Sequence, residues 1–277
     1  MQNLMGDGKK KCWLKLLGNR RVWYFLGGIF LLLGGVGCNS RQNCQPGVLR
    51  LYKQADVTTL DPALSNDVTS GELCALIYDG LVQFNNQLKV IPNLAYKWEI
   101  KQQGQVYIFY LRSDIRFSNG RRCTAKDVKY SFERVLAPGS RSSRKWLFDR
   151  IVGAWDFYYG RTKEVKGIQI LDSLTVKITL KEPYYLFLQF LAMPAASIVP
   201  REEVGKWGED FTTHPVGTGP WKLASWQPND QLVLIPNEYY FGQPPRLKKV
   251  IYRIIPETMT ATSEFEVGNL DIIKIPD

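Results

Sequence analysis

The sequence predicts a fold of mixed helices and strands, either α+β or α/β with a mixed sheet. Short stretches with the pattern of strands follow one another through the chain, and short stretches with helical spacing interrupt them. Many of the strands read as hairpins, without a strict alternation of one strand and one helix. The 277 residues are 45% hydrophobic, which is enough for one large core or two modest ones.

The N-terminal segment has the pattern of an export signal. A basic flank precedes residues 22–37, a run without charges that contains five glycines and ends at Cys38. A spanning helix needs about 20 apolar residues, and glycine disfavours a helix, so we interpret residues 1–37 as a signal peptide. The stretch Gly35-Val36-Gly37-Cys38 resembles a lipobox, except that Gly35 stands where the pattern usually has Leu. This resemblance implies that Cys38 is lipidated; an uncleaved anchor helix ending in an incidental cysteine is the alternative.

Charge and cysteine content exclude some functions and leave others open. The net charge is +10, but six of the basic residues precede Cys38, and the remaining charges are interspersed, so nucleic acid is not an expected partner. Residues 38–47 are polar and predict a short tether. Cys44, Cys74 and Cys123 match no zinc or redox spacing, and they form either one disulfide or buried free thiols.

The first half of the folded part begins with a strand and a helix. Residues 48–52 predict the strand, and residues 68–81 predict the helix, which Asn66 or Asp67 caps. Residues 98–111 predict a hairpin that turns at Gln103 and Gly104. Residues 124–127 have the spacing of a capping box, and the helix that follows continues to Val135.

The second half is predicted to contain the same kinds of elements. The expected elements are a hairpin at 168–171 and 175–180, an apolar helix at 184–191 with Pro183 in its first turn, strands at 223–226, 232–235 and 250–254, a helix at 258–267, and a strand at 270–273.

Motifs for catalysis are missing from the sequence. His214 is its one histidine, which predicts an exposed loop imidazole, and no HExxH, G-x-S-x-G or Walker motif occurs. In GTGP, Pro220 removes an amide that a phosphate cradle would need, so Gly217 and Gly219 are expected to permit a tight turn. We therefore expect no enzyme, no metal and no cofactor.

Two loops carry residues suited to ligand binding. LDPALSND, at residues 60–67, brings polar side chains to a helix start, and SRSSRKWLFD, at 140–149, places Trp146 among basic residues. From spacing alone, Trp146 is expected to pack against a helix end.

Several segments together resemble the solute-binding proteins of peptide- and nickel-type ABC transporters, called extracellular solute-binding family 5. They occur in the family's order across residues 48–275, with the block from Phe117 to Arg134 the most specific. The segments are LDPALSND, IYDGLV, PNLAYKWEI, VYIFYLRSDIRFSNGRRCTAKDVKYSFERV, TVKITLKEPYYLFL, IVPREEV, PVGTGPWKL and FEVGNLDII.

The resemblance implies the fold and the partners. The fold would be α/β with a mixed sheet, like type II periplasmic binding proteins, and residues 48–277 would form the N-terminal lobe with an extra subdomain. The chain would be a lipid-anchored monomer in the periplasm or on the outer face of the cell membrane. It would capture a peptide, a nickel chelate or a similar solute for a permease and an ATPase. A secreted hydrolase and a structural or adhesive lipoprotein are the alternative functions.

The resemblance also places the ligand-binding residues. By position in the family pattern, Ser65, Asn66, Asp67 and Val68 fall where the first lobe meets ligand. Arg144 and Trp146 fall in the loop that supplies an aromatic and polar wall, and the Arg144 guanidinium suits a carboxylate.

Family members are about twice as long, so we expect the second lobe to be absent from this sequence. We also expect the sequence alone to be a truncated product, poorly soluble and unable to bind solute.

Overall fold

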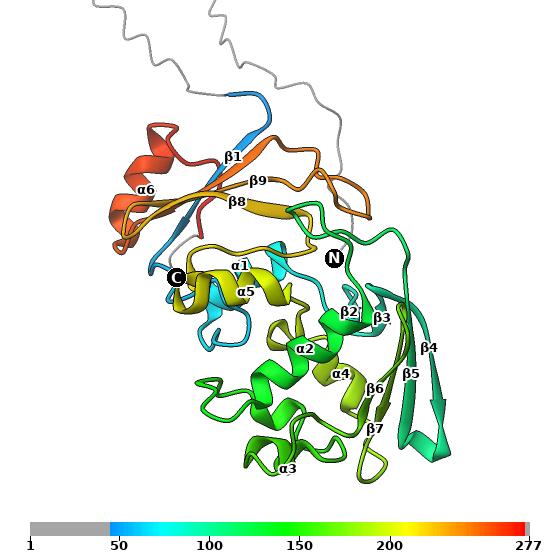
Figure 1. The fold of residues 1–277 in the computed structure, drawn as a ribbon. Coiled ribbons are helices and arrows are strands. Elements are labelled where there is room, and N and C mark those ends of the chain that lie inside the picture. The colour runs from blue at the N-terminus through cyan, green and yellow to red at the C-terminus, as the bar shows by residue number, and fades with distance from the viewer. Residues whose placement is uncertain (1–44, 275–277) are drawn as a thin grey trace, which may run out of the picture. The chain divides into compact units, whose positions relative to one another are not determined.

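The computed structural model describes residues 45–274, so the signal segment, Cys38 and Cys44 lie outside the described residues. Within the described range, no helix combines the length and the apolar character that a membrane crossing requires. The first of three sheets has the strand order β1-β10-β9-β8 (Figure 1). Its strands are β1 (Val48–Lys53), β10 (Lys249–Ile254), β9 (Gln231–Pro236) and β8 (Trp221–Gln227). β1 runs parallel to β10 and the other pairs are antiparallel, which confirms the predicted mixed sheet.

The second sheet is antiparallel and has the order β4-β5-β7-β6. It combines the two predicted hairpins: β4 (Ala95–Lys101) with β5 (Val106–Leu111), and β6 (Ile168–Asp172) with β7 (Thr175–Thr179). β2 (Val82–Phe84) and β3 (Val90–Pro92) form a small third sheet, which lies outside the elements predicted from the sequence.

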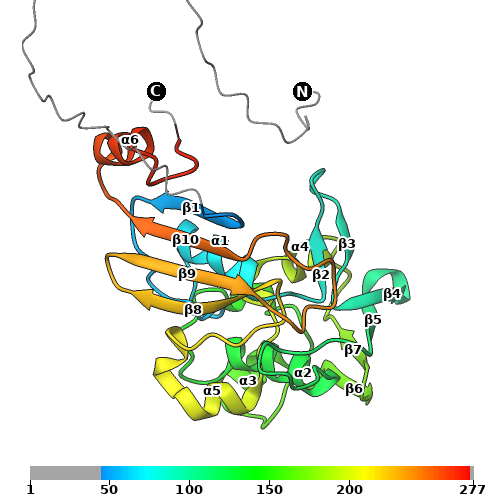
Figure 2. The ribbon, with the colours of Figure 1, turned by 90° about the horizontal axis from the view of Figure 1, so that it is seen from above.

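Each large sheet has its own hydrophobic core. The core of the mixed sheet includes Leu73 and Ile77 of α1 (Val68–Ile77), and Val204 and Trp207 of α5 (Arg201–Trp207) pack against it. The core of the antiparallel sheet includes residues of α2 (Ala125–Leu136), α3 (Ala154–Tyr158) and α4 (Phe187–Leu191). α6 (Thr258–Glu266) follows β10, and Figure 2 shows the four strands of the mixed sheet side by side. The apolar content is therefore divided between two main cores.

Local sequence explains where two helices begin. The Asp67 side chain accepts the Ser70 N–H at 2.8 Å and caps α1, which decides between the two candidate caps. The capping box of α2 is present, with the Asp127 carboxylate accepting the Thr124 N–H at 2.8 Å. The predicted positions of both N-termini are confirmed.

Tertiary contacts shift two predicted boundaries. α1 ends at Ile77 instead of residue 81, because the GTGP segment packs against its end and the Gly219 N–H donates to the Ile77 carbonyl at 2.9 Å. α4 begins at Phe187 instead of residue 184, since Tyr184 accepts from the Phe187 N–H in a preceding turn. Pro183 therefore lies before the first turn of α4.

Residues 270–273 do not form the predicted strand. The Asp271 N–H donates to the Arg50 carbonyl at 2.8 Å, as a strand partner would. The return bond, however, runs from the Arg50 N–H to the Asp271 side chain, also at 2.8 Å, so the ladder does not continue.

The helix α5 also lies outside the elements predicted from the sequence. Cys74 and Cys123 are buried free thiols, which is one of the two alternatives predicted from the sequence.

Candidate functional site

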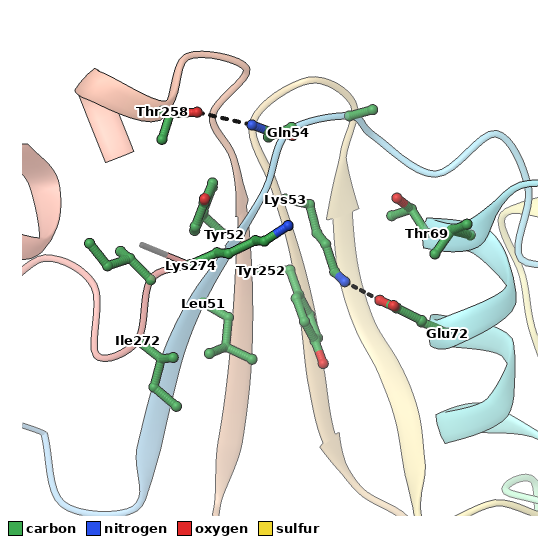
Figure 3. Close-up of a pocket in the computed structure, with 13 residues that line it drawn as sticks. Leu51, Tyr52, Lys53, Gln54, Thr69, Glu72, Tyr252, Thr258, Ile272 and Lys274 are labelled. Atoms are coloured by element: carbon green, nitrogen blue, oxygen red, sulfur yellow. Dashed lines mark hydrogen bonds and ion pairs between the residues drawn. The ribbon is translucent and has the colours of Figure 1, made fainter. Parts of the chain in front are cut away.

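A cavity of about 810 Å³, called the β1–α1 cavity below, lies at the C-terminal end of β1 (Figure 3). Its walls come from β1, the first turns of α1, β10, the start of α6 and the segment 272–274. The lining residues are Leu51, Tyr52, Lys53, Gln54, Ala55, Val68, Thr69, Glu72, Tyr252, Thr258, Ile272, Ile273 and Lys274. Segments from both ends of the folded chain therefore form one site.

An ion pair between β1 and α1 lies in the lining of this cavity. Lys53 Nζ contacts the Glu72 carboxylate, with 23% of the lysine side chain and 54% of the glutamate side chain exposed. Figure 3 shows the two side chains pointing toward each other. Lys53 Nζ also lies 5.8 Å from the centre of the Tyr252 ring. The cavity thus offers a cation, a carboxylate and an aromatic face to a solute.

The four residues expected from loop 60–67 and the helix start differ in their roles. Val68 is 77% exposed and lines the cavity, and Asn66 is exposed. Ser65 is buried against Cys74, and Asp67 is occupied as the α1 cap, accepting also from the Thr58 hydroxyl at 2.7 Å. Although partial burial opposes ionisation of Asp67, hydrogen bonds from Ser70 and Thr58 outweigh it and hold its pKa below the usual value.

Arg144 and Trp146 do not line this cavity. The Trp146 ring is 41% exposed and packs edge-on against Phe190 at 4.9 Å, which is the packing expected from spacing alone. A separate cavity of about 280 Å³ joins the two predicted loops through Asp61, Leu64, Ser140 and Arg141. The loops are therefore neighbours, but the expected ligand residues do not share one cavity.

Asp61 and Arg134 connect these loops to α2. Arg134 Nη1 donates to Asp61 Oδ1 at 2.7 Å, and Nη2 contacts the second carboxylate oxygen. The Asp61 side chain is only 2% exposed, so this bidentate pair holds loop 60–67 on the last turns of α2. No motif in the sequence pointed to this pair.

Gly217 and Gly219 have a packing role rather than the tight-turn role expected from the sequence. A Cβ atom on Gly217 would lie 2.1 Å from the Ile77 carbonyl oxygen, and one on Gly219 would lie 2.6 Å from the Ile77 carbonyl carbon. Neither residue is among the glycines with positive φ. Glycine is required because two backbone segments approach closely.

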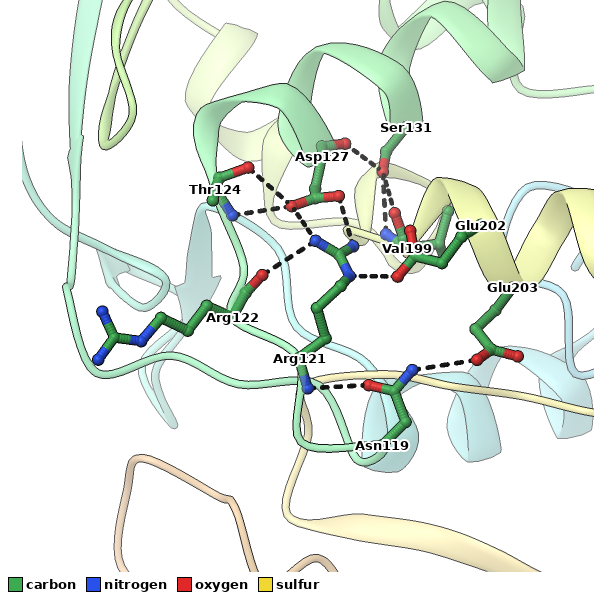
Figure 4. Close-up of polar contacts among 9 residues, drawn as sticks. All are labelled: Asn119, Arg121, Arg122, Thr124, Asp127, Ser131, Val199, Glu202 and Glu203. Carbon is green, nitrogen blue, oxygen red and sulfur yellow. Dashed lines mark hydrogen bonds and ion pairs between the residues drawn. The ribbon is translucent and has the colours of Figure 1, made fainter.

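Arg121 and its neighbours form a polar network that joins a loop to two helices (Figure 4). Arg121 donates to both Asp127 oxygens, at 2.6 and 3.1 Å, and its Nε contacts the Glu202 carboxylate on α5. Arg121 holds the structure together at this place, and it lines none of the cavities described above.

The described residues contain no group of three His, Cys, Asp or Glu side chains placed to hold a metal ion. His214 is exposed, as expected, and its ring stacks on Trp207 with 3.6 Å between ring centres.

Comparison with known proteins identifies the family to which this chain belongs. The chain belongs to the bacterial extracellular solute-binding proteins, family 5, because the model of that family (its middle region) matches residues 89–277. The glutathione-binding protein GsiB of Salmonella paratyphi A is 29% identical over 215 residues, covering 77% of this chain and 39% of that protein. The nickel-binding periplasmic protein of Escherichia coli is 31% identical over 201 residues, covering 72% of this chain and 36% of the relative.

A solved structure supports the fold assignment. The periplasmic oligopeptide-binding protein OppAIV of Borrelia burgdorferi is 29% identical, with a TM-score of 0.76, covering 81% of this chain and 46% of that protein. The fold is the mixed-sheet α/β fold of these binding proteins, as expected. The chain spans less than half the length of the relatives it matches.

Proposed function

We propose that this chain is part of the substrate-binding component of an ABC transporter, which captures a peptide or a similar small solute outside the cell membrane. The component delivers the solute to its permease and ATPase, and it works as a monomer without catalysis. Membership in family 5 is the observation that carries this proposal.

The β1–α1 cavity supports a peptide-like solute over a metal chelate. Lys53 and Glu72 supply opposite charges side by side, which suits a solute with both an amine and a carboxylate. The names of the relatives mention glutathione, nickel and oligopeptides, so they span several solutes. We also propose that Asn66 and Val68 contact the solute directly, that Ser65 and Asp67 support the loop, and that Arg144 and Trp146 form a further wall.

Native mass spectrometry of the complete protein purified from cells tests the function. The expected result is a small solute that co-purifies and is released chemically unchanged. A chemically altered product would favour a secreted hydrolase, and repeated absence of any small ligand would favour a structural or adhesive lipoprotein.

We further propose that Cys38 carries a lipid anchor, which keeps the receptor near its permease at high effective concentration. The Cys38→Ser variant should lose incorporation of a labelled fatty acid and be released from the membrane fraction. Cys44→Ser, a cysteine six residues further on, serves as the control and should keep the label. A labelled Cys38→Ser protein would contradict this assignment.

A further inference from the structure

A cluster of aromatic rings is exposed at α3, in the half of the described chain that contains the antiparallel sheet (Figure 1). Trp155 is 37% exposed and Tyr159 is 63% exposed. The ring centres of Trp155, Tyr158 and Tyr159 lie 5.1 to 6.0 Å apart. These side chains are amphipathic, with an apolar ring and a polar N–H or O–H.

Two basic side chains lie over these rings. Lys145 Nζ lies 5.4 Å from the centre of the Tyr158 ring, and the Arg161 guanidinium lies 5.3 Å from that of Tyr159. We call Lys145, Trp155, Tyr158, Tyr159 and Arg161 the α3 patch. Because a cation already covers one face of each tyrosine ring, the patch is poorly suited to stacking a base or a sugar.

The sequence segment that contains this patch carries an excess of basic residues. Residues 141–166 contain seven basic and three acidic residues, whereas residues 45–274 together contain 29 basic and 24 acidic residues. Most of the net positive charge therefore belongs to this segment. Lys163 and Lys166 are exposed, and 69% of the Arg161 side chain is exposed.

We propose that the α3 patch is a docking surface for an anionic phospholipid bilayer. Tryptophan and tyrosine concentrate where a protein meets the headgroup region, because their rings enter the apolar boundary while their polar ends stay hydrated. Lysine and arginine beside them attract anionic lipid. The patch combines both features on α3, the residues that follow it, and Lys145 in the short 3-10 helix that precedes it. This inference is independent of solute binding and of the lipid anchor.

Hydrogen exchange of the full chain in the presence of vesicles tests the proposal. The vesicles contain phosphatidylcholine alone or phosphatidylcholine with phosphatidylglycerol. Exchange at residues 154–163 should slow only on the vesicles with phosphatidylglycerol, and high salt should reverse the effect. Because this readout is local, protection at these residues reports contact of the patch itself with the vesicle. Equal exchange on both kinds of vesicle would overturn the proposal.

Two charge-reversal variants distinguish an effect of the patch on lipid binding from an effect of the net charge of the protein. In Arg161→Glu/Lys163→Glu, the lipid concentration that gives half-maximal protection should rise at least about tenfold. The control is Arg246→Glu/Lys248→Glu, which makes the same charge change at two exposed residues before β10 and should leave that concentration within about twofold of the native value. Equal effects of the two variants would show that only net charge matters and would overturn the proposal.

Discussion

At the scale of single residues, Asp79 is a buried carboxyl that should make the stability of the fold depend on pH. Its carboxylate is 8% exposed and accepts hydrogen bonds from Asn93 at 2.9 Å and from Thr218 at 3.2 Å. Burial disfavours the charged form more strongly than these two donors favour it, so the pKa of Asp79 rises to about 6. The carboxyl therefore binds its proton more tightly in the folded chain than in the unfolded chain.

This raised pKa predicts a loss of stability as the pH rises. Between the unfolded pKa of 3.8 and the folded pKa of about 6, the native state holds more protons, so the free energy of unfolding falls through this window. The loss amounts to at most about 3 kcal/mol and is complete above the folded pKa. Asp79→Asn removes the charge and retains a partner for both Asn93 and Thr218. Its free energy of unfolding in urea should therefore depend less on pH between pH 4 and 7.

The matched control is Asp230→Asn, which changes an exposed carboxyl in the turn between β8 and β9. It should leave the pH dependence of unfolding close to that of the native chain. If Asp79→Asn kept the native pH dependence in full, the stability argument for this carboxyl would be wrong.

At the scale of elements, Arg121 connects the start of α2 to α5. Its guanidinium bonds Asp127, whose side chain is 6% exposed, and contacts Glu202 on α5. It also lies 4.7 Å from the centre of the Phe117 ring. Removing this side chain would leave Asp127 with only the Thr124 backbone and hydroxyl donors, at 2.8 and 3.0 Å.

Arg121→Ala should therefore lower the free energy of unfolding by about 2 kcal/mol, because a mostly buried carboxylate loses its charged partner. Arg122→Ala is the control: the Arg122 side chain is exposed, and the network uses only its backbone carbonyl. That variant should change stability by less than about 0.5 kcal/mol. Equal losses in the two variants, measured by urea unfolding, would contradict a specific role for the Arg121 network.

At the scale of the whole molecule, the candidate site is assembled from segments far apart in the chain. β1 and α1 lie near the start of the folded part, whereas β10, α6 and residues 272–274 lie near its end. Trp146, which we propose as a further wall, packs against Phe190 beside the core of the antiparallel sheet.

We therefore expect two substitutions to weaken solute binding by the complete protein. Glu72→Gln should raise the dissociation constant about tenfold, because the cavity loses its carboxylate, and Trp146→Ala should raise it at least tenfold, which corresponds to about 1.4 kcal/mol. Tyr96→Ala, at an exposed tyrosine of β4 outside the β1–α1 cavity, is the control. Isothermal titration with the co-purified solute measures all three. An unchanged dissociation constant for Trp146→Ala would remove that residue from the site.

The sequence by itself determined the fold class, most strands and hairpins, and the starts of α1 and α2. These features depend on local signals: alternation of apolar residues, turn residues, and capping side chains such as Asp67 and Thr124. The sequence also placed Val68 at a helix start, and this residue lines the β1–α1 cavity.

Only the tertiary structure decided the ends of elements and the composition of the site. α1 ends where the GTGP segment packs against Ile77, and residues 270–273 stop short of a strand because the Asp271 side chain takes a backbone bond. Lys53 and Glu72 lie 19 residues apart in the chain, and their pairing across the cavity follows from how β1 lies against α1. Contacts between distant segments depend on the packing of whole elements, and no local pattern in the chain encodes them.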